Sequence, residues 1–241
     1  MGERIDKRMS EVAFCFPIVR VDFLPRALET LYKYTEVDFR VFVVDQSLEG
    51  LDKDFIKKYI HYYIRPFQNL GFAKAGNEML WTAYRQGYPY MAICNDDIEY
   101  MNKGWWQGIK DTFAMNDKIL LAAPMSPKEG GWGYGLTGEN NDTWIPPKGF
   151  IRDPQDDRSI LPERLSYKEN FTDEDYNYLV NEHPHWQKNS LCDGMAMWHP
   201  VFKREALEKV GYLDERFLYG KGEDYDYMAR VYRLKYRAVS T

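Results

Sequence analysis

Residues 90–125 of the chain read YMAICNDDIEYMNKGWWQGIKDTFAMNDKILLAAPM. The apolar runs at 90–94 and 119–125 have the length of buried strands, and residues 104–116 between them have the apolar spacing of a helix. A strand, a helix and a second strand in this order form the unit from which parallel sheets are built. This stretch therefore predicts an α/β fold.

The same alternation runs from residue 90 toward the N-terminus. Apolar runs predict three earlier strands, and amphipathic runs predict three earlier helices. The strands are expected at 12–19, 40–45 and 63–67, and the helices at 23–34, 51–63 and 71–87. Since 241 residues are an ordinary length for one α/β domain with insertions, we expect a single-domain three-layer sandwich with a mostly parallel central sheet.

The alternation stops after Met125. Residues 126–190 are rich in Gly, Pro, Asn and Asp and show little periodicity. A long segment of this kind inside a compact domain is more typical of a functional loop or lid than of a linker. The apolar pattern resumes at 191–200, and a further helix is expected near 203–210.

Composition and charge limit the function classes. The chain carries 32 basic and 37 acidic residues, a net charge of −5, which argues against a nucleic-acid binder that relies on broad positive charge. Cys15, Cys94 and Cys192 lie in apolar runs without metal-ligand spacing, as expected of buried thiols in a reducing compartment. The charged stretch 1–11 is not typical of a signal peptide, and no apolar run is long enough to span a membrane. We therefore expect a soluble, cytoplasmic chain, with peripheral membrane contact left open.

Two of the expected strands end in acidic residues. The strand at 40–45 ends in Asp45, and the strand at 90–94 continues into Asn95, Asp96 and Asp97. In an open parallel sheet, ligands bind beyond the carboxyl ends of the strands. Adjacent carboxylates there form either a solvated turn or a site for Mg²⁺ or Mn²⁺, which complete their shells with phosphate oxygens and water. No GxGxxG loop follows the first expected strand, and the GxxxxGK[ST] loop is absent, so a phosphate-bearing ligand would be held through the metal.

Five motifs carry a resemblance to a known family because they occur in the family's order. They are FPIVRVDFLPRALETL (16–31), VFVVDQS (41–47), NLGFAKAGNEML (69–80), ICNDD (93–97) and GYLDERFLYGKGEDYDYMAR (211–230). Together they resemble family 2 of the nucleotide-sugar glycosyltransferases, closest to its rhamnosyltransferase-like branch. The resemblance covers roughly residues 12–125 and 190–240 and implies the glycosyltransferase A fold.

The resemblance also implies an activity. It suggests inverting, divalent-metal-dependent transfer of a sugar from a UDP- or dTDP-sugar to a hydroxyl of a glycan, glycolipid or other acceptor, with Mn²⁺ or Mg²⁺ as cofactor. Residues 12–125 would form the nucleotide-sugar-binding half, 126–190 an acceptor or lid insertion, and 191–241 the acceptor side with a catalytic acidic pair. The alternatives are a catalytically silent sugar- or nucleotide-binding domain and, less favoured, a nucleotidyltransferase.

The family's roles map onto single residues of this chain. Asp45 would accept a hydrogen bond from the base, Asp97 would bind the metal, and Asp224 would be the general base, supported by Glu223. The residues implied in donor binding are Pro17, Val19, Arg20, Asp45, Asn69, Gly71, Lys74, Asn77, Asn95 and Asp96. The chain differs from the family pattern in having Asn95 in place of the first aspartate of D-x-D, and in showing no metal-binding His between the last helix and Thr241.

Other candidates have an ordinary structural explanation beside the functional one. Glu223 and Asp224 would also suit a helix N-terminus that favours negative charge, although Gly220 and Gly222 before them suggest a backbone close to a ligand. We expect acceptor contacts from Asp193, Trp132 and Asp226, where Asp193 could equally be a buried cap. Trp132, Tyr134 and Trp144 could stack on sugar rings. His183 and His185 flank Pro184, which disfavours a joint metal role.

Overall fold

The computed structural model describes residues 10–124, 190–192, 198–217 and 222–240. The strands in these ranges are β1 (Val12–Ile18), β2 (Phe39–Asp45), β3 (Tyr62–Ile64), β4 (Tyr90–Ile93), β5 (Ile119–Ala123), β6 (Ser190–Cys192), β7 (Val201–Lys203) and β8 (Arg237–Ser240). The helices are α1 (Leu24–Tyr34), α2 (Lys53–Tyr59), α3 (Phe72–Gln86), α4 (Trp105–Met115), α6 (Arg204–Lys209) and α7 (Glu223–Arg233).

The strands form one mostly parallel sheet, as predicted. Its order is β3-β2-β1-β4-β7-β5-β8-β6. β1 pairs in parallel with both β2 and β4, while β7 is inserted antiparallel between β4 and β5. β8 is parallel to β5, and β6 is antiparallel to β8 at the far edge. The first four strands therefore share one carboxyl-terminal edge.

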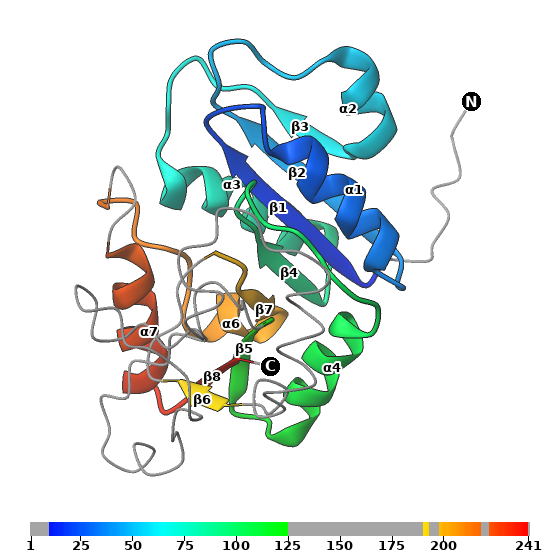
Figure 1. Ribbon diagram of the computed structural model, residues 1–241. Coiled ribbons are helices and arrows are strands. Elements are labelled where there is room, and N and C mark those ends of the chain that lie inside the picture. The colour runs from blue at the N-terminus through cyan, green and yellow to red at the C-terminus, as the bar shows by residue number, and fades with distance from the viewer. Residues whose placement is uncertain (1–9, 125–189, 193–197, 218–221, 241) are drawn as a thin grey trace, which may run out of the picture.

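Helices cover both faces of the sheet, which makes the molecule a three-layer sandwich (Figure 1). One face buries α1 and α4 through residues such as Leu28 and Trp106, and the other buries α3, α6 and α7 through residues such as Met79 and Tyr227. Burial of each large apolar side chain contributes about 1.5–3 kcal/mol. Gly76 lets α3 lie close to the sheet because it has no side chain. A Cβ at this position would lie 3.1 Å from the Ile93 side chain.

Three predicted helices are confirmed within one residue at each end, namely α1, α3 and α4. The predicted helix at 51–63 was too long. The Asp52 side chain caps α2 by accepting from the backbone N–H groups of residues 54 and 55, and the backbone is already extended at Ile60. β3 begins two residues later, so the helix is confined to Lys53–Tyr59.

The remaining expectations fall partly outside the described ranges. Cys15 and Cys94 are fully buried free thiols, as predicted, whereas the side chain of Cys192 is not described. Of the segment 126–190, only residue 190 is described, in β6. Within the described parts of the chain, none of the helices combines the length and apolar character needed to cross a membrane.

Candidate functional site

The carboxyl ends of β1, β2 and β4 meet at one edge of the sheet. Ile18 at the end of β1 pairs with Asp45 at the end of β2, and the backbone N–H of Gln46 donates to the Ile18 carbonyl at 2.9 Å. On the other side of β1, the backbone N–H of Cys94 donates to the Cys15 carbonyl at 2.8 Å. The residues that follow these strands therefore emerge side by side, at the place where open parallel sheets bind ligands.

The turn after β4, residues 95–99, carries the predicted acidic cluster and is called the acidic turn below. Asn95 and Asp96 are half-buried and Asp97 is exposed. Among the described residues, the buried Oδ2 atom of Asp96 has no hydrogen-bond partner. Burial, and after it the Asp97 carboxylate, raises the pKa of Asp96, while the Arg20 guanidinium acts in the opposite direction. An unpaired buried carboxylate oxygen is costly, and a cation placed beside it would offset that cost.

Val19 and Arg20 lie on the loop that follows β1, at the same edge. Val19 is 55% exposed, and the Arg20 guanidinium lies 4.4 Å from the ring centroid of Phe23. Pro17 is half-buried within β1 itself. Of these predicted donor-binding residues, Val19 and Arg20 are therefore accessible to a ligand beside the acidic turn.

Asp45 is placed at the predicted edge, but its carboxylate is already occupied. The residue is fully buried, and four protein groups donate to it: the N–H and hydroxyl of Ser47 at 2.9 and 2.5 Å, the N–H of Leu51 at 3.0 Å, and the hydroxyl of Tyr63 at 2.6 Å. Burial alone would raise the pKa of Asp45, but these hydrogen bonds outweigh it and lower the pKa. A nucleobase would have to displace one of these donors to bond with Asp45.

Burial and the Asp45 carboxylate also raise the pKa of Tyr63, to about 12, so the phenol remains a donor at neutral pH. Tyr63 is a residue that sequence reasoning missed. It lies in the run predicted to form β3, but nothing in that run indicates a partner at the end of β2. The Asp45–Tyr63 bond thus links the third strand to the end of the second.

The predicted residues on α3 divide into a surface group and a buried one. Asn69 accepts a hydrogen bond from the N–H of Gly71, which precedes α3 with a φ of 79°, and Lys74 is exposed on the first turn. Asn77 is buried and points elsewhere: its amide exchanges hydrogen bonds with the backbone of Leu213 at 2.8 and 2.9 Å and donates to Glu215 at 3.1 Å. Asn77 was expected to lie along the donor, whereas its polar atoms fasten α3 to the segment that leads toward α7.

The acidic residues of α7 have three different environments. Glu223 is buried, with 7% of its surface exposed, and follows Gly222, whose φ is 102°. Asp224 is half-buried, and its Oδ1 accepts from the N–H of Tyr225 at 2.8 Å. Asp226, expected to contact the acceptor, instead accepts from Arg230 at 2.9 Å. Asp226 is thus paired within its own helix, and the catalytic roles expected of Asp224 and Glu223 stay predictions.

Comparisons with known proteins give the fold its name. No family model and no curated protein matches this chain. Its structure resembles that of GalNAc-T7 with UDP, GalNAc and Mn2+ (TM-score 0.58, 11% identity, covering 98% of this chain and 43% of that one). It also resembles S. aureus TarS in complex with UDP (0.56, 15%, 96% and 57%) and the mannosyltransferase PcManGT from Pyrobaculum calidifontis with GDP-Man and Mn2+ (0.53, 14%, 96% and 55%).

The chain has the glycosyltransferase A fold. The likeness extends over nearly all of this chain, which spans about half the length of the solved structures it matches. Because the identities are 11–15%, the likeness shows the fold alone. In this fold class the edge that carries the acidic turn is the place to look for a ligand.

A divalent cation fits the acidic turn of this glycosyltransferase A fold. Within the described residues, no group of three or more His, Cys, Asp or Glu side chains is arranged to hold a metal ion. Mg²⁺ and Mn²⁺ do not need one, because they can be bound through one or two carboxylates together with substrate phosphates and water. The exposed carboxylate of Asp97 and the unpaired Oδ2 of Asp96 are oxygen ligands of the kind that would supply such a partial shell.

Several predicted residues lie outside the described ranges. These are Asp193 and Trp132, expected at the acceptor, together with Tyr134, Trp144, His183 and His185. Their roles stay predictions.

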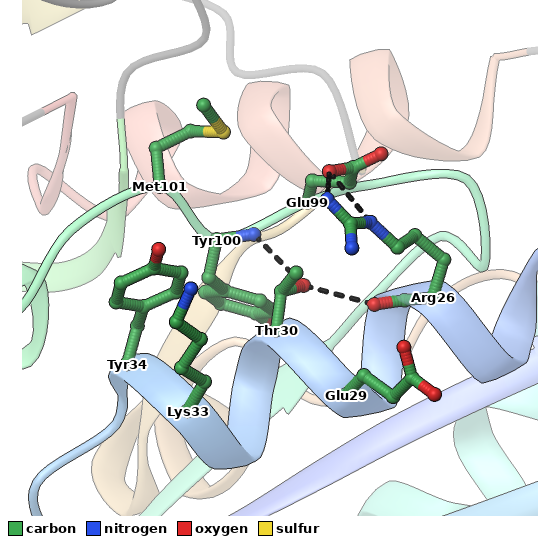
Figure 2. Close-up of a pocket in the computed structure, with 8 residues that line it drawn as sticks. All are labelled: Arg26, Glu29, Thr30, Lys33, Tyr34, Glu99, Tyr100 and Met101. Atoms are coloured by element: carbon green, nitrogen blue, oxygen red, sulfur yellow. Dashed lines mark hydrogen bonds and ion pairs between the residues drawn. The ribbon is translucent and has the colours of Figure 1, made fainter. Parts of the chain in front are cut away.

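A hollow of about 150 Å³ lies beside the acidic turn, between α1 and residues 99–101 (Figure 2). Arg26 and Lys33 from α1 and Glu99 from the turn line it, and Arg26 pairs with Glu99 at 3.0 Å. Arg20, Asp45, Asp96 and Asp97 do not line it. The hollow is thus separate from the carboxylates of Asp96 and Asp97 at the ligand edge of the sheet. Part of its charged lining, Arg26 with Glu99, is already paired.

Proposed function

We propose that this chain is a metal-dependent glycosyltransferase that moves a sugar from a nucleotide-diphosphate donor to a hydroxyl acceptor. The observation that carries the proposal is the acidic turn, where an exposed carboxylate and an unpaired buried carboxylate oxygen lie at the ligand edge of a glycosyltransferase A fold. Structures with this fold have been determined with UDP or GDP-Man, two of them with Mn2+. These neighbours support the class of donor and cofactor.

The donor would lie along the strand-end edge with its diphosphate over the acidic turn. Asp97 and Asp96 would hold the cation, Mn²⁺ or Mg²⁺, because hard oxygen ligands suit both ions. The bound cation supplies the positive charge that stabilises the leaving diphosphate. Arg20 lies close enough to Asp96 to affect its pKa and would add positive charge on the same side.

Asp224 would act as the general base, with Glu223 in support. The carboxylate of Asp224 takes the proton of the acceptor hydroxyl while that oxygen forms a bond to the anomeric carbon. The bond between the anomeric carbon and the diphosphate oxygen breaks in the same step, so the anomeric configuration inverts. A UDP- or dTDP-activated hexose or deoxyhexose is the proposed donor, in line with the rhamnosyltransferase-like motif at 69–80.

Donor hydrolysis in the absence of acceptor tests this proposal. The protein is incubated with UDP-, dTDP- and GDP-sugars and Mn²⁺, and the released nucleotide diphosphate is measured over time. Transferases leak to water, so slow release with one donor is expected, and proton NMR of the freed sugar should first show the inverted anomer. If every donor stays intact although UDP binds with Mn²⁺, the chain is a nucleotide-sugar-binding domain, an alternative that Asn95 in place of an aspartate favours.

A further inference from the structure

Tyr100 and His199 form a buried hydrogen-bonded pair that the proposed chemistry does not use. The Tyr100 hydroxyl lies 2.6 Å from His199 Nε2. His199 is fully buried and Tyr100 is 6% exposed. Both rings contact Trp105, and His199 also contacts Phe14, so the pair is enclosed by aromatic side chains on the α1–α4 face of the sheet.

The pair lies where the acidic turn ends. At the start of the turn, the backbone N–H of Asn95 donates to the carbonyl of Trp198 at 2.8 Å. Tyr100, which directly follows the turn, bonds through its hydroxyl to the side chain of His199, the residue after Trp198. Two consecutive residues, Trp198 and His199, therefore hold the two sides of one acidic turn.

A third anchor comes from α1. The backbone N–H of Tyr100 donates to the Thr30 hydroxyl at 3.2 Å, and that hydroxyl is itself bonded to backbone carbonyls of α1 (Figure 2). Side chains with buried, mutually bonded polar groups resist rearrangement, because any shift leaves a polar atom unsatisfied. The end of the turn is thus fixed from two directions.

The hydrogen bond between the two rings is insensitive to ordinary changes of pH. Burial lowers the pKa of His199 to about 4, so the imidazole is neutral near pH 7. Burial also raises the pKa of Tyr100 well above its usual value. The Tyr100 hydroxyl also lies 3.9 Å from Cys94 Sγ. If the phenol donates to that sulfur, Nε2 of His199 is the donor to the phenol oxygen.

We propose that Tyr100 and His199 are positioning residues that hold the acidic turn so that Asp96 and Asp97 face the ligand edge of the sheet. This inference rests on the proposed function, because it assigns the pair an effect on the cation and diphosphate bound there. Neither residue touches the reacting atoms. Their contribution is to keep the unpaired Asp96 oxygen from turning away from the ligand edge.

Binding of UDP and Mn²⁺ to Tyr100→Phe, His199→Phe and the double variant tests the pair. Residues that orient metal ligands typically contribute 10–100-fold in affinity, so each single variant should bind UDP with Mn²⁺ about 10-fold more weakly by calorimetry. The double variant should be close to either single one, because both remove the same bond. Electron paramagnetic resonance of free Mn²⁺ reports the metal affinity independently of any turnover.

Tyr227→Phe is the matched control. Tyr227 is equally buried, and its hydroxyl donates to the Gly211 carbonyl at 3.1 Å on the other face of the sheet. This variant should lower the melting temperature while leaving the affinity for UDP and Mn²⁺ unchanged. Thr30→Val removes the other anchor at the end of the turn and should weaken binding in the same direction, which keeps the test open if His199→Phe does not fold.

The outcomes separate the two proposals. If wild-type protein binds UDP in an Mn²⁺-dependent way and a folded Tyr100→Phe variant binds equally tightly, the positioning role is wrong. If the double variant is weakened by the product of the two single effects, the residues do not act through their shared bond and the inference also fails. If wild-type protein shows no Mn²⁺-dependent UDP binding at all, the proposed function itself is overturned.

Discussion

Replacing Asp45 by Asn should destabilise the protein more than it affects nucleotide binding. The carboxylate is fully buried and accepts from Ser47, Leu51 and Tyr63. In Asp45→Asn, the single amide oxygen can serve the two Ser47 donors, and the amide NH₂ then faces the Leu51 N–H and the Tyr63 hydroxyl. The phenol can rotate to accept, but the N–H of Leu51 cannot.

The expected loss in the free energy of unfolding follows from the number of hydrogen bonds that Asp45→Asn cannot make. A buried donor left unsatisfied costs about 1–3 kcal/mol, and hydrogen bonds to a charged acceptor are about twice as strong as neutral ones. Loss of the charge together with one orphaned N–H gives a loss of about 2–4 kcal/mol in the free energy of unfolding. Tyr63→Phe removes one hydrogen bond to the carboxylate and leaves three, so it should cost about 1.5–3 kcal/mol.

Urea denaturation at pH 7 measures this loss, with Asp38→Asn as the control. Asp38 lies just before the start of the same strand and is exposed, with hydrogen bonds to Ser10 and Arg40, so its change should be small. The Asp45 contribution should also depend on pH. Because the folded state lowers the pKa of Asp45, the stabilisation is present above the unfolded value near 4 and is lost as pH falls through the folded pKa.

The opposite pattern would refute this reasoning. If Asp45→Asn unfolds at the wild-type urea concentration but no longer binds UDP, the carboxylate serves the ligand and not the loop. The role that the family resemblance implies for Asp45 would then hold, and the four hydrogen bonds would have to open when the nucleotide binds.

Three further predictions concern the site and its surroundings. Asp97→Ala should abolish Mn²⁺-dependent UDP binding in calorimetry without lowering the melting temperature, whereas Asp117→Ala, at the opposite edge of the sheet, should bind normally; equal UDP binding with Mn²⁺ and with EDTA in wild type would contradict the metal role. Asp224→Asn should slow transfer by about 10²–10⁴-fold at unchanged UDP affinity, and unchanged turnover would remove the general base from α7. Because burial lowers the pKa of His199 to about 4, its burial should make the free energy of unfolding fall as pH decreases from about 6.5 toward 4, and a folded His199→Phe variant with the same pH dependence as wild type would show that other groups cause it.

Local patterns predicted the first half of the fold well. α1, α3 and α4 each carry an apolar stripe at helical spacing, and β1, β2 and β4 are buried on both faces, so periodicity alone indicates their type and order. Periodicity did not reveal β7, which has only three residues. It lies between β4 and β5 and pairs antiparallel with both. Its placement depends on pairing with distant strands, which a local pattern does not contain.

The candidate site could be predicted only as far as the strand ends. The acidic turn follows a recognisable strand, so its position at the sheet edge was foreseeable from the residues. The partners that decide what each polar side chain does are remote: Asn77 bonds to Leu213, 136 residues away, and Tyr100 to His199, 99 residues away. The sequence could not show that Asp45 and Asn77 have such protein partners, and their donor-binding roles stay predictions.

A crystal of the protein grown with UDP and Mn²⁺ shows whether the acidic turn binds a divalent cation. Anomalous scattering from manganese locates the ion without reference to any assumed site. We expect one manganese peak beside the Asp97 carboxylate and the diphosphate of UDP, with Asp96 Oδ2 no longer unpaired. UDP bound at the strand-end edge with no manganese at the acidic turn, or manganese bound elsewhere, would contradict it.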